Sequence, residues 1–300
     1  MKIAMLTVTR NDDYRFEEWC QYYSEYKNDI NLHIIIDDAS DLSYLKKIRS
    51  FFTESVIIAR NENGGSNAAL NDGIRYALKD SDIDALLILD NDIKLKPGSI
   101  KALYDYLYSD SKLGMVGPLV FQRESDRIEN FGVHQTWFSS KHLYHNRKID
   151  DLPDCETMYV DLVPGGINMV KRSFYETVGL QDEEIFMYCD ERDMCYRTYN
   201  AGLREGVTKN AVAWHQHKYC PPIGKRLKST FLTARNRTYL VRKYCGVIPA
   251  FISMSWSLII AYLATIKNWN NSESKEKFKQ ISDGVMAGFS KKLDNSNIWY

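Results

Sequence analysis

Residues 85 to 95 read ALLILDNDIKL, an apolar run that ends in two aspartates separated by one asparagine. A short continuous apolar run is typical of a buried strand, here Ala85–Leu89. Asp90 and Asp92 would repel each other if they lay close together away from water, and a divalent cation is the commonest compensation. The stretch therefore predicts a buried strand that ends at acidic side chains and a cation.

Strand-like and helix-like patterns alternate through the first hundred residues. Apolar runs predict strands at 3–8, 32–36 and 56–59 besides 85–89, and helical spacing of apolar residues predicts helices at 12–26, 40–52 and 67–78. Farther along, 115–121 reads as a strand and 185–200 as a helix that ends before Gly202. A βαβα series of this kind indicates a parallel sheet covered by helices, with ligands outside the carboxyl ends of the strands.

Two acidic pairs follow strands of this predicted sheet. Asp37 and Asp38 end the second strand, and Asp90 and Asp92 end the fourth, so both pairs point to the same rim. Between them, residues 61–73 (NENGGSNAALNDG) place two glycines before a helix, where backbone can approach a ligand closely. The absence of GxGxxG after the first strand and of GxxxxGK[ST] anywhere disfavours a Rossmann dehydrogenase or a P-loop enzyme.

Composition sets limits on partners and compartment. Acidic and basic residues balance at 39 each, so the net charge does not indicate binding to nucleic acid. The six cysteines are scattered without a CxxC pair, which fits a reducing compartment. The N-terminus lacks the long apolar core of a signal peptide, which predicts a cytoplasmic protein.

Seven motifs in order resemble a family 2 glycosyltransferase with the nucleotide-sugar-binding fold called GT-A. They are TVTRN, IIIDDAS, NENGGSNAALNDGI, LLILDNDIKL, VPGGINMV, FMYCDERDMCYRTYNAGL and AVAWH. The later RNRTYLVRKY and KQISDGVMAGF resemble the tail of bacterial rhamnosyltransferase-like members. The resemblance implies an α/β GT-A fold over residues 1–220, Rossmann-like with a mixed, mainly parallel sheet flanked by helices, and a C-terminal helical extension over 221–300.

The resemblance also implies a donor site with a divalent metal. Asp38, with Thr7, would bind the base and ribose, as carboxylates and hydroxyls bind ring NH groups and sugar hydroxyls. Asp92 would bind Mg²⁺ or Mn²⁺ directly, and Asp90 would reach the ribose or a metal-bound water, since hard oxygen ligands suit these ions. The other predicted nucleotide-sugar contacts are Arg10, Asn63, Gly64, Gly65, Asn67, Asn91, Gly165 and Gly166.

A histidine follows the last strand-like stretch, AVAW. His215 matches the late histidine of the family and is a candidate metal or phosphate ligand, and His217 is its competitor.

The acidic base motif of the family, usually Glu-Asp-x-Asp, matches Asp190 to Asp193 with its first two acids exchanged. By position Glu191 is the predicted general base, which would deprotonate the acceptor hydroxyl, and Asp190 is the alternative because its side chain is one methylene shorter. Arg197 could pair with Asp193 or with the diphosphate, and the structural pairing is favoured.

The implied reaction is an inverting single displacement. A sugar would move from dTDP-rhamnose or a UDP-hexose to a saccharide or lipid-linked saccharide in cell-surface polysaccharide synthesis. A sugar-phosphate nucleotidyltransferase is one alternative, but it needs a Gly-rich basic loop after the first strand, and TVTRNDD has no glycine. The other alternative is a noncatalytic sugar- or membrane-docking protein that uses the basic residues between 225 and 243.

Residues 248–266 form the longest apolar stretch, nineteen residues without a charge. The length is near the minimum for a membrane span, and Pro249 and three serines weaken that interpretation. The stretch fits a helix that lies on a membrane surface, packs in the core or contacts a second copy of the chain. We therefore expect a protein peripheral to the cytoplasmic face of the inner membrane, and a homo-oligomer through the C-terminal helices is a further expectation.

Overall fold

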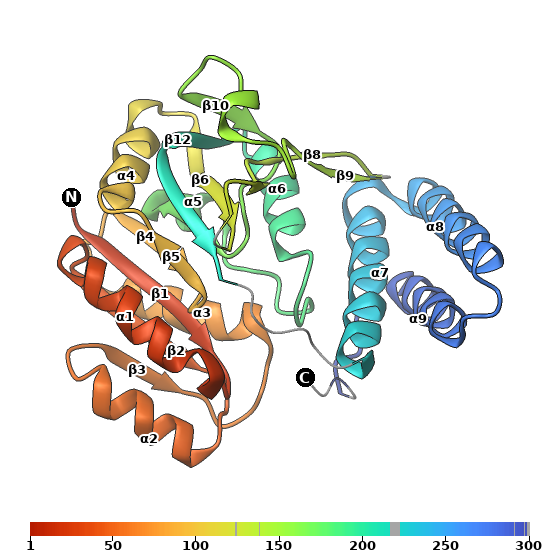
Figure 1. Ribbon diagram of the computed structural model, residues 1–300, viewed down its shortest axis with the longest axis horizontal. Coiled ribbons are helices and arrows are strands. Elements are labelled where there is room, and N and C mark those ends of the chain that lie inside the picture. The colour runs from red at the N-terminus through yellow and green to blue at the C-terminus, as the bar shows by residue number, and fades with distance from the viewer. Residues whose placement is uncertain (124, 138, 217–222, 291, 297, 299–300) are drawn as a thin grey trace. The chain divides into compact units, whose positions relative to one another are not determined.

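The computed structural model describes residues 1–300 except 124, 138, 217–222, 291, 297 and 299–300 (Figure 1). The chain forms two compact units. The sheet unit comprises Met1–His134, Lys141–Gln181 and Met194–His217, and the helical unit comprises Gln135–Ser140, Asp182–Asp193 and Lys218–Tyr300. Two segments that precede residue 220 thus group with the C-terminal helices, and one of them contains the acidic motif at 190–193.

A ten-stranded mixed sheet organises the sheet unit, in the order β10-β12-β6-β11-β4-β1-β2-β3, with β5 paired to β12 and β7 to β6. The first four strands pair in parallel, and β11 is antiparallel to both β4 and β6. The strands are β1 (Ile3–Thr9), β2 (Leu32–Asp37), β3 (Val56–Ala59), β4 (Ala85–Leu89), β5 (Ile93–Leu95), β6 (Leu113–Gln122), β7 (Ile128–Asn130), β10 (Thr157–Val160), β11 (Ile167–Lys171) and β12 (Arg204–His215), with a separate pair β8 (Val133–Gln135) and β9 (Ser140–His142).

Helices cover both faces of this sheet because its strands alternate side chains between two cores. In β1, Ile3 and Met5 join the core with α1 (Phe16–Tyr26), α2 (Leu42–Phe51) and α4 (Ser99–Ser109). Ala4 and Leu6 join the core with α3 (Ser66–Ala77) and α5 (Arg172–Val178). All four side chains are fully buried. The predicted α/β fold with a mainly parallel first half is confirmed, and the carboxyl ends of β1, β2 and β4 share one edge.

Three long helices dominate the helical unit, α7 (Ile223–Cys245), α8 (Val247–Lys267) and α9 (Ser272–Gly288). Helix α9 packs closely on α7 at two glycines one turn apart. A Cβ atom at Gly284 would lie 2.5 Å from the Phe231 carbonyl oxygen, and one at Gly288 would lie 2.0 Å from that of Arg235. Only glycine permits this approach of two helix backbones.

One predicted helix begins later than expected. Helix α6 runs over Asp190–Asn200, so the prediction of a helix from residue 185 is wrong for its first five residues. Tyr188 and Cys189 have φ angles of 69° and 64°, in the left-handed region that a right-handed helix does not use. The first turn of α6 therefore starts directly after two left-handed residues.

Candidate active site

Both acidic motifs of the sheet unit meet at Thr9, the last residue of β1. The Asp38 backbone NH donates to the Thr9 carbonyl oxygen at 3.0 Å. The Asn91 amide donates to the Thr9 hydroxyl at 3.2 Å and to the Asp12 carboxylate at 2.8 Å. The Thr9 hydroxyl also bonds to that of Tyr44 at 2.7 Å. The two motifs thus lie at one rim, as the strand order predicts, and Asn91 fixes the second motif to the loop after β1.

Asp92 lies between two basic side chains. Only 5% of the residue is exposed, and its carboxylate accepts a bond from Arg15 at 2.5 Å. The same oxygen lies 3.4 Å from Nε2 of His215, at the end of β12. Because a buried carboxylate is costly without compensation, these two basic side chains stabilise the Asp92 carboxylate at the end of β4.

His215 connects Asp92 to a second carboxylate. Its Nδ1 lies 2.6 Å from the Glu129 carboxylate on β7. Burial disfavours the charged imidazole, but the hydrogen bonds to Asp92 and Glu129 outweigh burial and raise the pKa of His215 to about 10. A carboxylate on one ring nitrogen is the usual partner of a histidine that binds metal through the other. Without a metal the imidazole is therefore charged. A metal ion at Nε2 would have to displace the proton there, and Glu129 would then hold the remaining proton at Nδ1.

Asp90 occupies the exposed end of the same motif. Its backbone NH donates to the Gly166 carbonyl oxygen at 2.9 Å. A Cβ atom at residue 166 would lie 2.9 Å from a carboxylate oxygen of Asp90, so a larger residue there would displace this exposed carboxylate. Gly165 precedes it, with its carbonyl oxygen bonded to the Asn168 amide at 3.2 Å. The predicted glycine pair thus shapes the position of the Asp90 carboxylate.

Asp38 binds the glycine loop before α3. Its two carboxylate oxygens accept bonds from the backbone NH groups of Gly64 at 3.1 Å and Gly65 at 3.0 Å, and Arg60 forms an ion pair with it at 2.6 Å. Asn63 adds a bond to the Gly65 NH at 3.2 Å. Oδ1 accepts two of these bonds and Oδ2 accepts one, so Oδ2 keeps a lone pair with which a nucleotide contact is compatible.

The remaining donor-site predictions lie around the same edge. Thr7 is 1% exposed on β1, and its hydroxyl has no hydrogen-bond partner among the residues that the structure describes. Asn67 is buried in the first turn of α3, and Arg10 is exposed directly after β1. The alternative ligand His217 lies outside the described residues.

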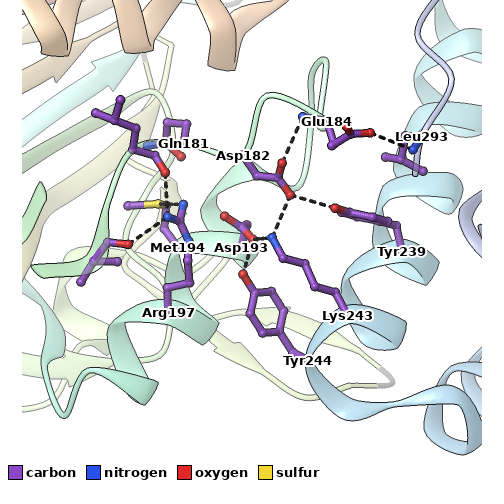
Figure 2. Close-up of polar contacts among 12 residues, drawn as sticks. Gln181, Asp182, Glu184, Asp193, Met194, Arg197, Tyr239, Lys243, Tyr244 and Leu293 are labelled. Carbon is purple, nitrogen blue, oxygen red and sulfur yellow. Dashed lines mark hydrogen bonds and ion pairs between the residues drawn. The ribbon is translucent and has the colours of Figure 1, made fainter. Parts of the chain in front are cut away.

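The acidic motif at 190–193 belongs to the helical unit, where α7 supplies its partners. Asp193 is fully buried and accepts bonds from Lys243 at 3.1 Å and from the Tyr244 hydroxyl at 2.6 Å (Figure 2). Lys243 also donates to Asp182 at 2.8 Å, and so does Tyr239 at 3.1 Å. These contacts fix both ends of the segment 182–193 to one helix.

The two left-handed residues before α6 are bonded to α7 as well. Asn236, which is fully buried, donates to the carbonyl oxygens of Met187 at 2.8 Å and Tyr188 at 3.0 Å. Leu293 and Asn295 bond in turn to Glu184, at 2.9 Å and 3.0 Å. The backbone that presents Asp190 and Glu191 therefore depends on α7 and on residues near 294. Burial raises the pKa of Glu191, as a general base requires.

Arg197 serves the structure of the sheet unit. It donates to the carbonyl oxygens of Val178 at 3.1 Å and Leu180 at 2.6 Å. These bonds fix the chain after α5. The favoured pairing of Arg197 with Asp193 stays a prediction, and the bonds described for Asp193 come from Lys243 and Tyr244.

Sequence reasoning missed several residues that surround the predicted ones. Each of them contacts a predicted residue through its charge or a hydrogen bond, from an element distant in sequence. Sequence alone does not show which of the many charged and polar residues meet in this way. They are Thr9, Arg15, Arg60, Glu129, Asn236, Lys243 and Tyr244.

The fold and this rim define a class, the GT-A glycosyltransferases. A structure of GalNAc-T7 with UDP, GalNAc and Mn²⁺ matches with a TM-score of 0.61 at 12% identity, over 81% of this chain and 48% of that one. The mannosyltransferase PcManGT from Pyrobaculum calidifontis, in complex with GDP-Man and Mn²⁺, matches with a TM-score of 0.59 at 12% identity, over 96% and 86%. At this identity the likeness shows the fold alone.

Sequence comparison gives the family. Residues 27–176 match Glycosyl transferase family 2, and the chain belongs to this family. It is 24% identical over 209 residues to the low-salt glycan biosynthesis hexosyltransferase Agl10 of Haloferax volcanii, covering 68% of this chain and 65% of that protein. It is 23% identical over 259 residues to the dTDP-rhamnosyl transferase RfbF of Shigella flexneri, covering 81% and 82%. The expected rhamnosyltransferase-like membership is confirmed.

Proposed function

We propose that this protein transfers a sugar from a nucleotide-sugar donor to a saccharide or lipid-linked saccharide, with inversion at the anomeric carbon, in the synthesis of a cell-surface polysaccharide. The observation that carries the proposal is the Asp92 carboxylate, buried at the end of β4 between Arg15 and His215. Similarity to the dTDP-rhamnosyl transferase favours dTDP-rhamnose as donor, with a UDP-hexose as the second candidate.

The donor side of the site fits Mg²⁺ or Mn²⁺. Asp92 offers a hard oxygen ligand and His215 an imidazole nitrogen, both compatible with these ions. Among the described residues, no cluster of three or more His, Cys, Asp or Glu side chains forms a metal site by itself. A diphosphate is therefore expected to provide the remaining oxygen ligands. The bound ion would supply neutralisation of the charge on the departing nucleoside diphosphate.

The nucleoside and sugar contacts are assigned to the rest of the rim. Asp38 and Thr7 bind the base and ribose, and the loop 63–67, whose glycine NH groups donate to Asp38, lies against the nucleotide. Asp90, set beside Gly165 and Gly166, reaches the ribose or a metal-bound water. Arg10, after β1, is placed at the same edge and offers a cation to the diphosphate.

The acceptor side is assigned to the start of α6. Glu191 removes the proton from the acceptor hydroxyl, the acceptor oxygen bonds to the anomeric carbon, and the bond from that carbon to the diphosphate breaks. Burial raises the pKa of Glu191 toward neutral pH. A base whose pKa lies near the working pH is largely ionised and still accepts a proton readily. Asp190 stays the alternative base.

The C-terminal region is assigned to a membrane surface at the cytoplasmic side. Helix α8 is long and apolar enough to cross a membrane by length and composition, and 17% of its most apolar window is buried. A helix with exposed apolar residues next to basic ones can also lie flat on anionic lipid, which suits a lipid-linked acceptor.

The test is release of nucleoside diphosphate from a panel of dTDP-, UDP- and GDP-sugars, with Mn²⁺, with Mg²⁺ and with chelator. Wild type is expected to hydrolyse one donor slowly, only with metal, and Asp92→Ala is expected to be inactive. A matched control is Asp105→Asn, which removes an exposed carboxylate paired with Lys101 on α4. If wild type releases no nucleoside diphosphate from any donor and shows no metal-dependent nucleotide binding, a noncatalytic docking protein would be the better interpretation.

A further inference from the structure

Helix α8 exposes an apolar surface that its own unit does not cover. Exposed fractions are 74% for Ile248, 57% for Phe251, 51% for Ile259 and 56% for Leu263. These residues recur along the whole helix, so the exposure is continuous rather than one isolated side chain. Apolar surface of this extent on a soluble unit marks an interaction site.

A groove of about 610 Å³ lies beside this surface, between α7, α8 and α9. Its two walls differ in chemistry. Helix α7 lines it with the hydroxyls of Ser229, Thr230 and Thr233 and with Arg237, whereas the wall from α8 and α9 is mostly apolar. The latter includes Trp256, Ile260, Ala264, Ile281 and Val285. The volume falls within the range of small-ligand pockets, and a groove with one polar wall suits an amphipathic ligand.

The groove and the exposed surface are continuous through two side chains. Trp256 and Ile260, one helical turn apart, line the groove and are also 52% and 49% exposed. A hydrocarbon chain that leaves a membrane in contact with α8 would therefore reach the groove along these two apolar side chains.

The basic residues of α7 indicate which lipid head group would bind beside the groove. This helix carries seven Lys and Arg residues and neither Asp nor Glu, and two of the seven pair with acids elsewhere, Arg226 with Glu273 and Lys243 with Asp182 and Asp193. Lys225 and Arg226 are exposed in its first turn, one turn before the groove residues Ser229 and Thr230, and Arg237 lines the groove. A phosphate is the group that such a run of cations recognises best.

We propose that the groove between α7, α8 and α9 binds the hydrocarbon chain of a phosphate-bearing lipid taken from the membrane on which α8 lies. The phosphate of that lipid contacts the cations of α7. The inference rests on the proposed function, because the lipid is the carrier of the acceptor saccharide. It adds a binding site for the lipid part of the acceptor, separate from the donor rim.

Farnesyl phosphate, a short isoprenoid phosphate, is the probe, titrated into the full-length protein by calorimetry and native mass spectrometry. Wild type is expected to bind one molecule saturably, and inorganic phosphate is expected not to compete at the same concentration. Ala264→Trp, which fills the groove from an exposed position, should weaken binding about tenfold or more. Ile259→Trp, on the same helix but outside the groove, should leave it within about twofold.

Arg237→Gln should weaken binding by about fivefold, because it keeps the side chain but removes the charge. Absence of saturable binding in wild type, or equal binding by Ala264→Trp and wild type, would overturn the proposal. An assay of donor hydrolysis distinguishes failure of the lipid-binding proposal from failure of the proposed transferase function. Wild type that hydrolyses a nucleotide sugar but does not bind farnesyl phosphate has only the donor site. Lipid binding without donor hydrolysis would support the lipid site in the groove and would contradict the proposed transferase function.

Discussion

Asp92 and Asp193 are both almost fully buried carboxylates, 5% and 0% exposed, yet they are neutralised by different parts of the chain. Asp92 pairs with Arg15 and His215, at the ends of strands or in the loop after β1. Asp193 pairs with Lys243 and Tyr244, on the last turns of α7. The proposed donor site is thus held together by the sheet unit, whereas the segment that contains the proposed base is held by α7. Substitutions in α7 should affect transfer without affecting donor binding.

The largest expected effect is that of Asp92→Ala. Loss of the carboxylate removes the proposed metal ligand and the acid that Arg15 and His215 share, so metal-dependent donor turnover should fall by about 10³-fold. Rate of nucleoside diphosphate release is the measurement, with circular dichroism as the check on folding. Retention of more than a tenth of the wild-type rate would show that the rim does not act through Asp92.

Glu191→Gln tests the base segment directly. The amide cannot accept the acceptor proton, so transfer should fall by about 10²-fold while donor affinity and slow donor hydrolysis persist. Asp190→Asn is the matched variant, and it should retain most of the transfer rate. The reverse result, with Asp190→Asn inactive and Glu191→Gln active, would assign the base to Asp190.

Asn236→Ala tests whether α7 belongs to the machinery of transfer. The change leaves the carbonyl oxygens of Met187 and Tyr188 without their donor in a buried site, at a cost of about 2 kcal/mol. Transfer should fall about 30-fold at unchanged donor affinity. Asn268→Ala, at an exposed position after α8, is the control and should behave as wild type. An equal loss of donor binding in Asn236→Ala would abolish the distinction between the two regions.

The smallest expected effect is that of Glu129→Gln. The amide still reaches Nδ1 of His215 but no longer carries the charge that orients and polarises the imidazole. The metal concentration for half-maximal activity should rise about tenfold, with a nearly normal rate at saturating metal. A metal titration of donor hydrolysis gives both quantities. An unchanged titration curve would mean that Nε2 of His215 does not bind the ion.

The placement of both acidic motifs at one edge of the sheet could be predicted from the sequence because it depends on local patterns. Asp38 and Asp90 directly follow buried strands, and parallel strands bring their carboxyl ends to one edge. The partners of these acids could not be predicted in the same way. Arg15 lies 77 residues before Asp92, and Arg60 lies 22 residues after Asp38, so only the folded sheet shows which charges meet.

The start of α6 could not be predicted for a related reason. Residues 185–189 have ordinary helical composition, and helical propensity is a weak guide when tertiary contacts oppose it. Here Asn236, 48 residues beyond Tyr188, bonds to the carbonyl of a left-handed residue and stabilises a backbone that local sequence does not favour. The sequence therefore predicts where the acids lie along the chain but not the geometry in which Glu191 is presented.

The bonds from Leu293 and Asn295 to Glu184 have a consequence for synthesis on the ribosome. Translation proceeds from the N-terminus, and domains fold as they emerge. The strands and loops of the donor rim are complete once His215 has been made, whereas the segment that presents Glu191 still waits for residues 293 and 295. We therefore expect a nascent chain to be able to bind a nucleotide sugar before it can transfer the sugar. Competence for transfer would be acquired only after these residues have emerged from the ribosome.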